Sequence, residues 1–328
     1  MTLPGPPSDP WNRLAEAAGS IFATKEWAEC WWNHYGGPST PVIVADSDQN
    51  PTYVLPLYLS KGPLRRLRFI GHGPADQLGA VCGAQAIPEA SEKLKTILAG
   101  QGLAHDVFLA QDVLEAEGWD ARLDGTVVRH VASPIVRLET DDWDAFLAQK
   151  SKNFREQTRR RERKLEKAFS ARFRLSDRSS LDADLTALFR LHSERWNEGA
   201  PFASGLEKAF HEEFACAALR QGWLRLWMLE LDGRPVAALY GFRFAGVEYF
   251  HQSGRDPKFE EHSVGSVLLT HSIRTALQDG MREYRLLRGD ESYKSRFADA
   301  DRDVHTVAVA RTLRGKVAIA AAPLRGRR

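Results

Sequence analysis

The chain has 328 residues, 43% of them hydrophobic, which is enough for two globular domains of ordinary size. Its 45 Lys and Arg residues against 43 Asp and Glu leave a formal charge of +2. The net charge of the whole chain therefore favours neither DNA nor a membrane surface as a partner, and any basic surface must be local. The apolar runs are too short to span a bilayer.

Compartment and metal use are indicated by the cysteines and the first residues. Cys30, Cys82 and Cys216 are widely spaced, odd in number and lack metal-ligand spacing, which predicts free thiols and no metal site. The first twenty residues have neither the basic nor the apolar region of a signal peptide. We expect a cytoplasmic protein without a membrane span or a bound metal.

The first half of the chain predicts helices and strands in a definite order. A helix is followed by a hairpin around an Asp/Ser/Asn turn, a third strand, a second helix that ends in glycine, and two further strands. The expected ranges are 24–35, 40–59, 65–73, 87–102, 105–111 and 130–139.

The second half repeats this order. Helices at 143–167 and 181–196 precede strands at 223–231, 234–244 and 247–254, the first two joined by an Asp-Gly turn. A helix capped by Ser263 and closed by Gly280 leads to a strand at 282–289, which a helical crossover makes parallel to its neighbour. A last strand covers 303–311.

The repeated order predicts two tandem α+β domains, residues 1–145 and 146–328. The second domain begins with a basic segment at 150–167, where Lys152, Arg155 and Arg159 lie toward one helical face. Either this is a solvated helix with internal ion pairs, or its face binds an anion such as the phosphate of a nucleotide or an RNA.

Three other groups of residues have both a structural and a functional interpretation. Ser263, Gly265 and Ser266 begin a helix after a strand, where backbone N–H groups either need only an N-cap or bind a phosphate. On another helix, one face carries a trio that either packs in the core or lines a cleft: His192, Arg195 and Trp196.

The third group is RGDESYKSRF, residues 288–297, directly after a predicted strand. Asp290 or Glu291 would serve as a general base, Tyr293 as a general acid and Lys294 as an anion contact, unless the segment is only a charged surface loop. Nucleophile-elbow, zinc-protease, P-loop and dinucleotide-binding motifs are absent from the sequence.

Several segments together resemble the GNAT-type acetyltransferase family associated with cellulose biosynthesis (the CelD/BcsL type), related in fold to the Fem peptidyltransferases. The quoted segments are SKNFREQTRRRERKL, LFRLHSERW, LELDGRPVAALYGFRF, SGRDPKFEEHSVGSVLL and LLRGDESYKSRF, with IFATKEWAECWWNHYGG, VLPLYL and LRRLRFIGHGPADQLGAVCG in the first half. The likeness covers nearly the whole chain.

The resemblance implies two tandem GNAT folds, each a mixed, mostly antiparallel sheet flanked by helices. It implies acyl transfer in the second fold, with acyl-CoA, above all acetyl-CoA, as co-substrate and no metal. His262 departs from the family's usual start of the pyrophosphate loop, so an acyl carrier is a further donor. The acceptor is a small molecule or a glycan bearing an amine or hydroxyl group.

Within this resemblance, Asp290, Tyr293 and Lys294 match the charged segment after the second of two splayed strands. Lys294, Lys152, Arg155 and Arg159 would hold the donor's phosphates. Two rival functions remain open from the sequence: a Fem-like aminoacyltransferase that takes its donor from tRNA, and a double-GNAT binding scaffold without catalysis.

Overall fold

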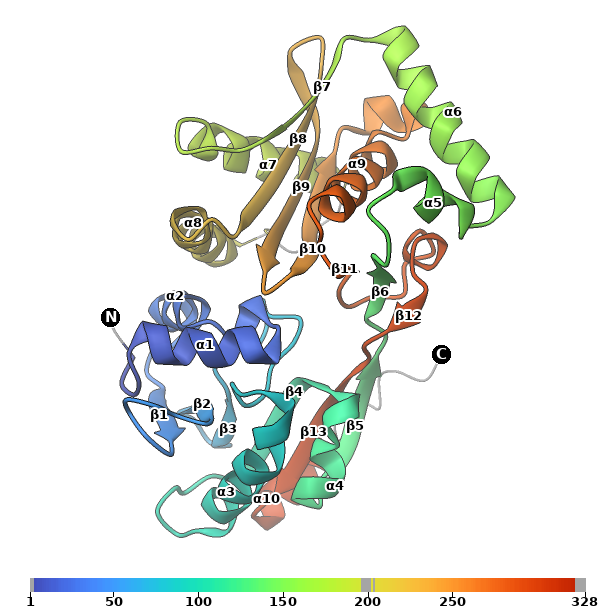
Figure 1. The fold of residues 1–328 in the computed structure, drawn as a ribbon. Helices are drawn as coiled ribbons and strands as arrows, with labels where there is room; N and C mark the ends of the chain where they lie inside the picture. Colours follow the sequence, from blue (N-terminus) through green and yellow to red (C-terminus); the bar gives the residue numbers. More distant parts are fainter. Residues whose placement is uncertain (1–2, 196–201, 203, 322–328) are drawn as a thin grey trace. The chain divides into compact units, whose positions relative to one another are not determined.

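The computed structural model describes residues 3–195, 202 and 204–321. Contacts divide the chain into two units, neither of which is continuous in sequence. The N-terminal unit comprises Met1–Ser133, Arg288–Asp290 and Asp301–Arg328, and the C-terminal unit comprises Pro134–Leu287 and Glu291–Ala300. Each unit is built around one mixed sheet with helices packed on it (Figure 1).

The sheet of the N-terminal unit has the strand order β1-β2-β3-β4-β13-β5. Its strands are β1 (Thr40–Ala45), β2 (Val54–Leu59), β3 (Arg66–Phe69), β4 (Val107–Leu114), β5 (Thr126–Val131) and β13 (Val304–Ala310). The first three form an antiparallel meander, and β4 pairs parallel with β3. The helices of this unit are α1 (Ser8–Ala18), α2 (Lys25–Tyr35), α3 (Ile87–Ala99), α4 (Trp119–Leu123) and α10 (Leu313–Ala321), with 3-10 turns η1 (Ile21–Ala23), η2 (Ala84–Ala86) and η3 (Glu115–Glu117).

The sheet of the C-terminal unit has the order β12-β6-β11-β10-β9-β8-β7. Its strands are β6 (Pro134–Arg137), β7 (Ala171–Leu175), β8 (Leu224–Leu231), β9 (Arg234–Phe244), β10 (Val247–Arg255), β11 (Glu283–Arg285) and β12 (Ala300–Asp301). Its helices are α5 (Trp143–Ala148), α6 (Lys152–Ala168), α7 (Leu181–Arg195), α8 (Gly205–Arg220) and α9 (Val264–Gln278), with 3-10 turns η4 (Pro257–His262) and η5 (Lys294–Arg296).

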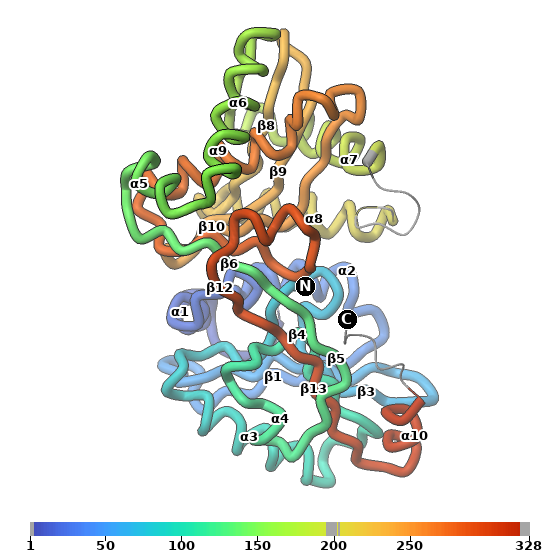
Figure 2. The backbone as a smooth tube through the Cα atoms, turned by 90° about the vertical axis from the view of Figure 1, so that its right-hand side faces the viewer, coloured from blue at the N-terminus to red at the C-terminus, as the bar shows by residue number. Residues whose placement is uncertain are grey.

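The α+β fold class predicted from the sequence is confirmed, and so is the repeated order of meander, helix and parallel strand. The last strand of each predicted half lies elsewhere. The segment expected as one strand at 130–139 is split, and β6 joins the C-terminal sheet, whereas β13 inserts between β4 and β5 of the N-terminal sheet. Figure 2 shows β13, in red, running beside β4 and β5.

Helices cover both faces of the C-terminal sheet. In Figure 1, α7 and α8 lie on one side and α9, α5 and α6 on the other. Alternate residues of the strands serve the two layers: Leu239 of β9 belongs to the core beneath α9, and its neighbour Tyr240 contacts His211 of α8. Within the described residues, no helix has both the length and the apolar character needed to cross a bilayer.

A β-bulge in β10 decides which residues face each layer. The pairing with β9 shifts by one residue between Phe250 and Gln252. Because an extra residue reverses the alternation of side chains, Phe250, Ser253 and Arg255 all lie on the α9 side. Gly254 consequently faces α7.

The close approach of α7 to β10 depends on this glycine. A Cβ atom at Gly254 would lie 2.4 Å from the backbone nitrogen of His192 and 2.6 Å from the carbonyl carbon of Leu191. Both neighbours are main-chain atoms of a helix, so they cannot turn away as a side chain would.

We therefore expect Gly254→Ala to destabilise the protein by about 1–3 kcal/mol, the usual cost of overpacking. Gly205→Ala is the matched control, since a Cβ atom at Gly205 meets nothing within 4 Å. Urea unfolding followed by circular dichroism measures both variants. Equal stability of the two would show that α7 does not need this contact.

Candidate functional site

The strands β10 and β11 pair in parallel over only three residues and then separate. The last pair joins Tyr249 to Arg285, whereas β10 continues to Arg255. β11 ends early because the chain turns: Leu287 has φ 59° and Gly289 has φ 122°, values outside the range of a strand. The edge of β10 beyond Tyr249 therefore has no ladder with β11.

The helix α9 begins beside this separated part of β10. Its N-cap residue is Ser263, as predicted, but Ser263 has φ 52° and its side chain makes no capping hydrogen bond. Since the first N–H groups of a helix have no partner within the helix, the amino end of α9 keeps its donors and its positive dipole for another group. Simple N-capping therefore does not account for Ser263.

A cavity of about 310 Å³ lies between these two elements within the C-terminal unit. Its lining combines the α9 side of β10, the turn η4, the first two turns of α9 with their N-cap, and one tyrosine: Phe250, Ser253, Arg255, Glu260, Ser263, Gly265, Ser266, Leu269 and Tyr293. The predicted group Ser263, Gly265 and Ser266 thus shares a cavity with Tyr293.

The side chain of Arg255 crosses the amino end of α9. A Cβ atom at Gly265 would lie 3.4 Å from Cδ of Arg255, so the arginine side chain runs within van der Waals distance of this glycine. Arg255 Nη2 lies 3.3 Å from Oε1 of Glu260, a pair at the surface. A guanidinium and free helix N–H groups at the same place suit an anionic oxygen, above all a phosphate.

Tyr293 contributes the phenol of the cavity. The residue is half-buried, it packs on the core beneath α9, and its ring meets that of Phe250 edge to face at 6.3 Å between centroids. The other residues of the same predicted group are placed differently. Asp290 and Glu291 are exposed, and Asp290 belongs to the N-terminal unit.

Lys294 is buried rather than presented to a ligand. Its side chain donates to the carbonyl oxygen of Leu287 at 3.2 Å and lies 2.9 Å from Oε2 of Glu291. Only 3% of the residue is exposed, so its ammonium group holds the turn after β11 together. This placement gives Lys294 a structural role and does not bring it to the cavity.

Two of the three basic residues of α6 singled out in the sequence contact α5 and its following turn. Arg155 donates to the carbonyl oxygen of Lys150 at 2.6 Å, and Arg159 pairs with Asp144 at 2.9 Å. Lys152 is exposed, with Glu156 at 3.9 Å. None of these three is among the residues that line the cavity in the described part of the chain.

The predicted trio on α7 lies on the other side of the sheet from α9. His192 is 1% exposed and packs edge to face on Phe202 at 4.9 Å, so it belongs to the core between α7 and the sheet. Arg195 ends α7, and its side chain is outside what the structure describes, as is Trp196 altogether. The structure does not bring His192 to the cavity.

Sequence reasoning missed five residues of the cavity. Phe250, Ser253 and Arg255 share a face only because of the β-bulge, which simple alternation does not predict. Glu260 and Leu269 lie on η4 and α9, where their facing direction follows from the packing. The segment SGRDPKFEEHSVGSVLL contained most of these residues without showing which of them face a ligand.

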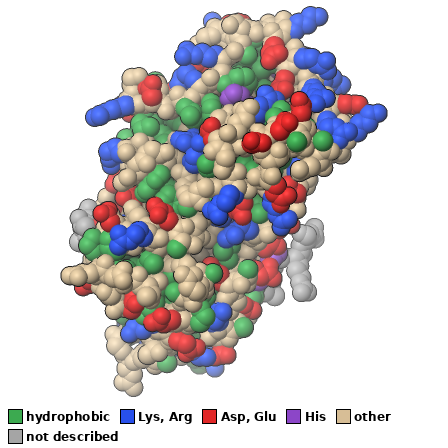
Figure 3. Space-filling model, in the orientation of Figure 1, with side chains coloured by type: hydrophobic (Ala, Val, Ile, Leu, Met, Phe, Trp, Pro, Cys, Tyr) green, Lys and Arg blue, Asp and Glu red, His purple; other side chains and the backbone are tan. Residues whose placement is uncertain are grey.

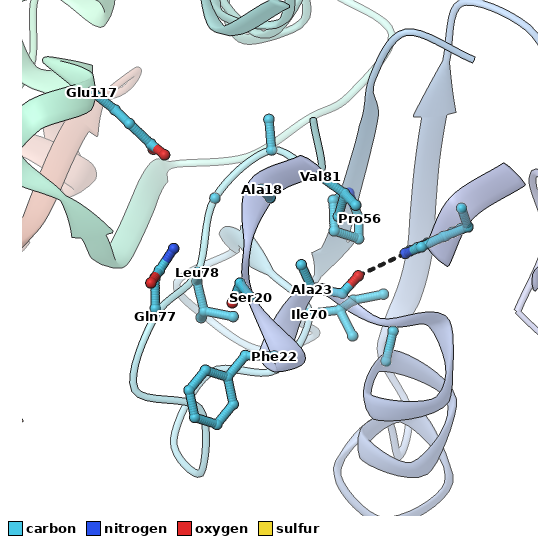
Figure 4. A pocket seen from close by; sticks show the side chains of 14 residues that line it. Ala18, Ser20, Phe22, Ala23, Pro56, Ile70, Gln77, Leu78, Val81 and Glu117 are labelled. Carbon is cyan, nitrogen blue, oxygen red and sulfur yellow. Dashed lines mark hydrogen bonds between the residues drawn. The ribbon is translucent and has the colours of Figure 1, made fainter. Parts of the chain in front are cut away.

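A second cavity, in the N-terminal unit, is too small for a substrate. Its volume is about 20 Å³, roughly the room needed for one water molecule. Figure 4 shows it between Ser20, Phe22 and Leu78, with the hydrogen bond from Trp11 to the carbonyl oxygen of Ala23 at 2.8 Å alongside.

A comparison with known protein families gives a match in the C-terminal unit, where the larger cavity lies. Residues 152–295 match the family model described as an acetyltransferase (GNAT) domain. The matched segment contains every residue that lines the cavity. No curated protein matches the sequence of the chain.

Solved structures extend the likeness to both sheets. FemX is 11% identical, with a TM-score of 0.65 over 92% of this chain and 96% of that one. L-PGS from Bacillus licheniformis is 12% identical, with a TM-score of 0.59 over 89% and 93%. The C-terminal domain of a protein assigned to lysylphosphatidylglycerol synthetases, from Agrobacterium fabrum, is 10% identical, with a TM-score of 0.62 over 95% and 94%. At such identities these likenesses show the fold alone.

The first residue of the RGDESYKSRF segment, Arg288, has a structural role in the N-terminal unit. Its guanidinium lies 2.5 Å from Asp76 and 2.5 Å from Asp112 and also donates to the carbonyl oxygen of Gly73. Burial alone would lower the pKa of Arg288, but the two carboxylates raise it above its usual value. The side chains of Asp112 and Asp76 are only 3% and 11% exposed.

Arg288→Met should destabilise the N-terminal unit by about 3–5 kcal/mol, because it removes the cation shared by two poorly solvated carboxylates and leaves Asp112 with only the more distant Arg129, at 3.8 Å. Arg13→Met, at an exposed position of α1, is the control and should change stability little. Thermal unfolding of both variants checks this. If they unfold at the same temperature, the cluster contributes nothing to stability.

Proposed function

We propose that the C-terminal unit is an acyltransferase that takes an acyl group from a thioester donor, acyl-CoA in the first place, and transfers it to an amine or a hydroxyl group. The observation that carries this proposal is the uncapped amino end of α9 opening into a cavity along the separated edge of β10. The match of the same segment to an acetyltransferase domain supports it.

The cavity provides for each part of such a donor. The N–H groups at the start of α9, with Arg255 above Gly265, bind the phosphates. Beyond Tyr249, β10 is no longer paired with β11. This edge of β10 offers backbone donors and acceptors to the amide groups of the donor's pantetheine arm. N–H groups of the same edge would polarise the thioester carbonyl where negative charge develops during attack.

The transfer itself needs two proton movements. The acceptor attacks the carbonyl carbon, a new C–N or C–O bond forms, and the C–S bond breaks. The departing thiolate takes a proton from the hydroxyl of Tyr293, which lines the cavity. The proton of the acceptor goes to a carboxylate: Glu260 lines the cavity, while Asp290 and Glu291 are the bases predicted from the RGDESYKSRF segment.

A second donor class is aminoacyl-tRNA, and the exposed side of α6 favours it. Helix α6 has eight Lys and Arg against three Glu, and six of these cations are exposed: Lys152, Arg159, Arg160, Arg163, Lys164 and Lys167. Figure 3 shows Lys and Arg side chains gathered over this helix. Lys164 reaches the carbonyl oxygen of Glu261 at 3.0 Å, which places the basic helix next to the turn η4 of the cavity.

The acceptor that the family resemblance favours is a glycan or a small cell-envelope precursor, modified in the cytoplasm. Purified protein incubated with acetyl-, malonyl- and longer acyl-CoAs, and separately with aminoacyl-tRNA, tests the donor directly. Mass spectrometry follows the acyl group to the product. Transfer from tRNA alone would replace the first donor by the second, and binding of neither donor would leave a scaffold without catalysis.

Ser266→Glu should weaken acyl-CoA binding at least tenfold, whereas Ser266→Gln should change it little. An acidic residue suits the first turn of a helix, so the fold is kept. Its charge, about 5 Å from a phosphate at an effective dielectric constant of about 20, costs about 3 kcal/mol, more than the 1.4 kcal/mol of a tenfold loss. Isothermal titration calorimetry measures both variants. Equal affinities of the two variants would show that the donor's phosphates do not bind at the amino end of α9.

Tyr293→Phe should lower kcat by about 100-fold and leave the affinity for the donor unchanged, since only the proton donor is lost. Glu260→Gln, Asp290→Asn and Glu291→Gln, measured in the same steady-state assay, identify the base as the variant whose kcat falls comparably. A Tyr293→Phe enzyme with normal turnover would exclude the phenol as the acid.

A further inference from the structure

Four polar side chains of the N-terminal unit gather on one face of its sheet, outside the site described above. His130 of β5 and His305 of β13 are directly paired residues of neighbouring strands. Asp303 precedes His305 by two positions and so points to the same face, and Glu115 follows the end of β4, where its N–H donates to the carbonyl oxygen of Asp303 at 3.0 Å. The register of three adjacent strands thus assembles the group.

The distances within this group suit a metal ion. Oε2 of Glu115 lies 3.4 Å from Nε2 of His130 and 3.5 Å from Nε2 of His305. Zinc bonds of about 2.0–2.2 Å to nitrogen and oxygen in a tetrahedron require ligand atoms roughly 3.4 Å apart. The two imidazole nitrogens lie within 4.8 Å of each other. The half-exposed side chain of His130 has room to shorten this distance when a metal binds.

The charges favour the same interpretation. The ring centroids of the two histidines are 5.0 Å apart, so the two imidazoles are direct neighbours. The carboxylates of Glu115 and Asp303 bring two negative charges to the same place, which a divalent cation balances. Asp303 supplies the second of these charges: Oδ2 lies 3.0 Å from Nε2 of His130, and Oδ1 accepts the N–H of Ser133 at 3.2 Å, which fixes the carboxylate.

We propose that Glu115, His130 and His305 form a binding site for a divalent transition-metal ion of the zinc type, with Asp303 as the neighbouring carboxylate. Imidazole and carboxylate ligands suit Zn²⁺, Ni²⁺ and Cu²⁺ better than Mg²⁺ or Ca²⁺. Three protein ligands leave a coordination position for water or for a group from another molecule. The spacing of the cysteines, from which the sequence predicts no metal, has no bearing on these ligands.

The test is a Zn²⁺ titration of the full chain by isothermal calorimetry, after dialysis against a chelator. One equivalent should bind, and His305→Gln or Glu115→Gln should weaken binding at least about tenfold. Loss of a residue that only hydrogen-bonds to a metal ligand already costs about that much in affinity. His34→Gln, which removes a histidine of α2 outside the group, is the matched control and should bind as the unaltered protein does.

Two outcomes would overturn the proposal. The first is the absence of saturable Zn²⁺ binding by the unaltered protein, which would make the group a set of ion pairs only. The second is equal binding by His305→Gln and His34→Gln, which would assign the metal to other ligands such as the thiol of Cys216. Circular dichroism of each variant verifies that the fold is kept, and the Co²⁺ visible spectrum identifies imidazole and carboxylate ligation independently of affinity.

Discussion

The one extra residue in β10 is the constraint on which the cavity depends. Without the bulge between Phe250 and Gln252, strand alternation would turn Ser253 and Arg255 toward α7 and put Gly254 beneath α9. The helix α7 would then meet two side chains at a place where its backbone tolerates no Cβ atom. The same bulge therefore serves the packing of one face and the chemistry of the other.

Contacts far from the cavity hold the amino end of α9 in place. Tyr284 of β11 is fully buried, and its hydroxyl lies 2.7 Å from Oγ of Ser272, which ties the helix to the strand that leaves β10. Arg274 pairs with Glu162 of α6 at 2.6 Å. A ligand that binds the helix end meets groups already fixed by regular elements, so little ordering is needed on binding.

The sequence predicts the elements better than the site. Turn residues and periodicity gave the strands at 234–244 and 247–254 nearly as they are, because their hydrogen bonds are local. Helix α8 was not predicted, although its capping box of Ser204 and Glu207 is a local pattern. In the charged segment after β11, Lys294 was predicted as an anion contact, yet its side chain is buried against the carbonyl oxygen of Leu287, because burial and partners are set by the tertiary fold.

The position of β13 has a consequence for how the chain is synthesised and folds. Strand β5 pairs with β13 and has no other neighbour in its sheet among the described strands, so both β4 and β5 await a segment made after the whole C-terminal sheet. A growing chain would expose these two edges until β13 emerges, and unpaired edges favour pairing with other chains. The N-terminal sheet can therefore be completed only after the C-terminal unit has been synthesised, although each unit has its own core.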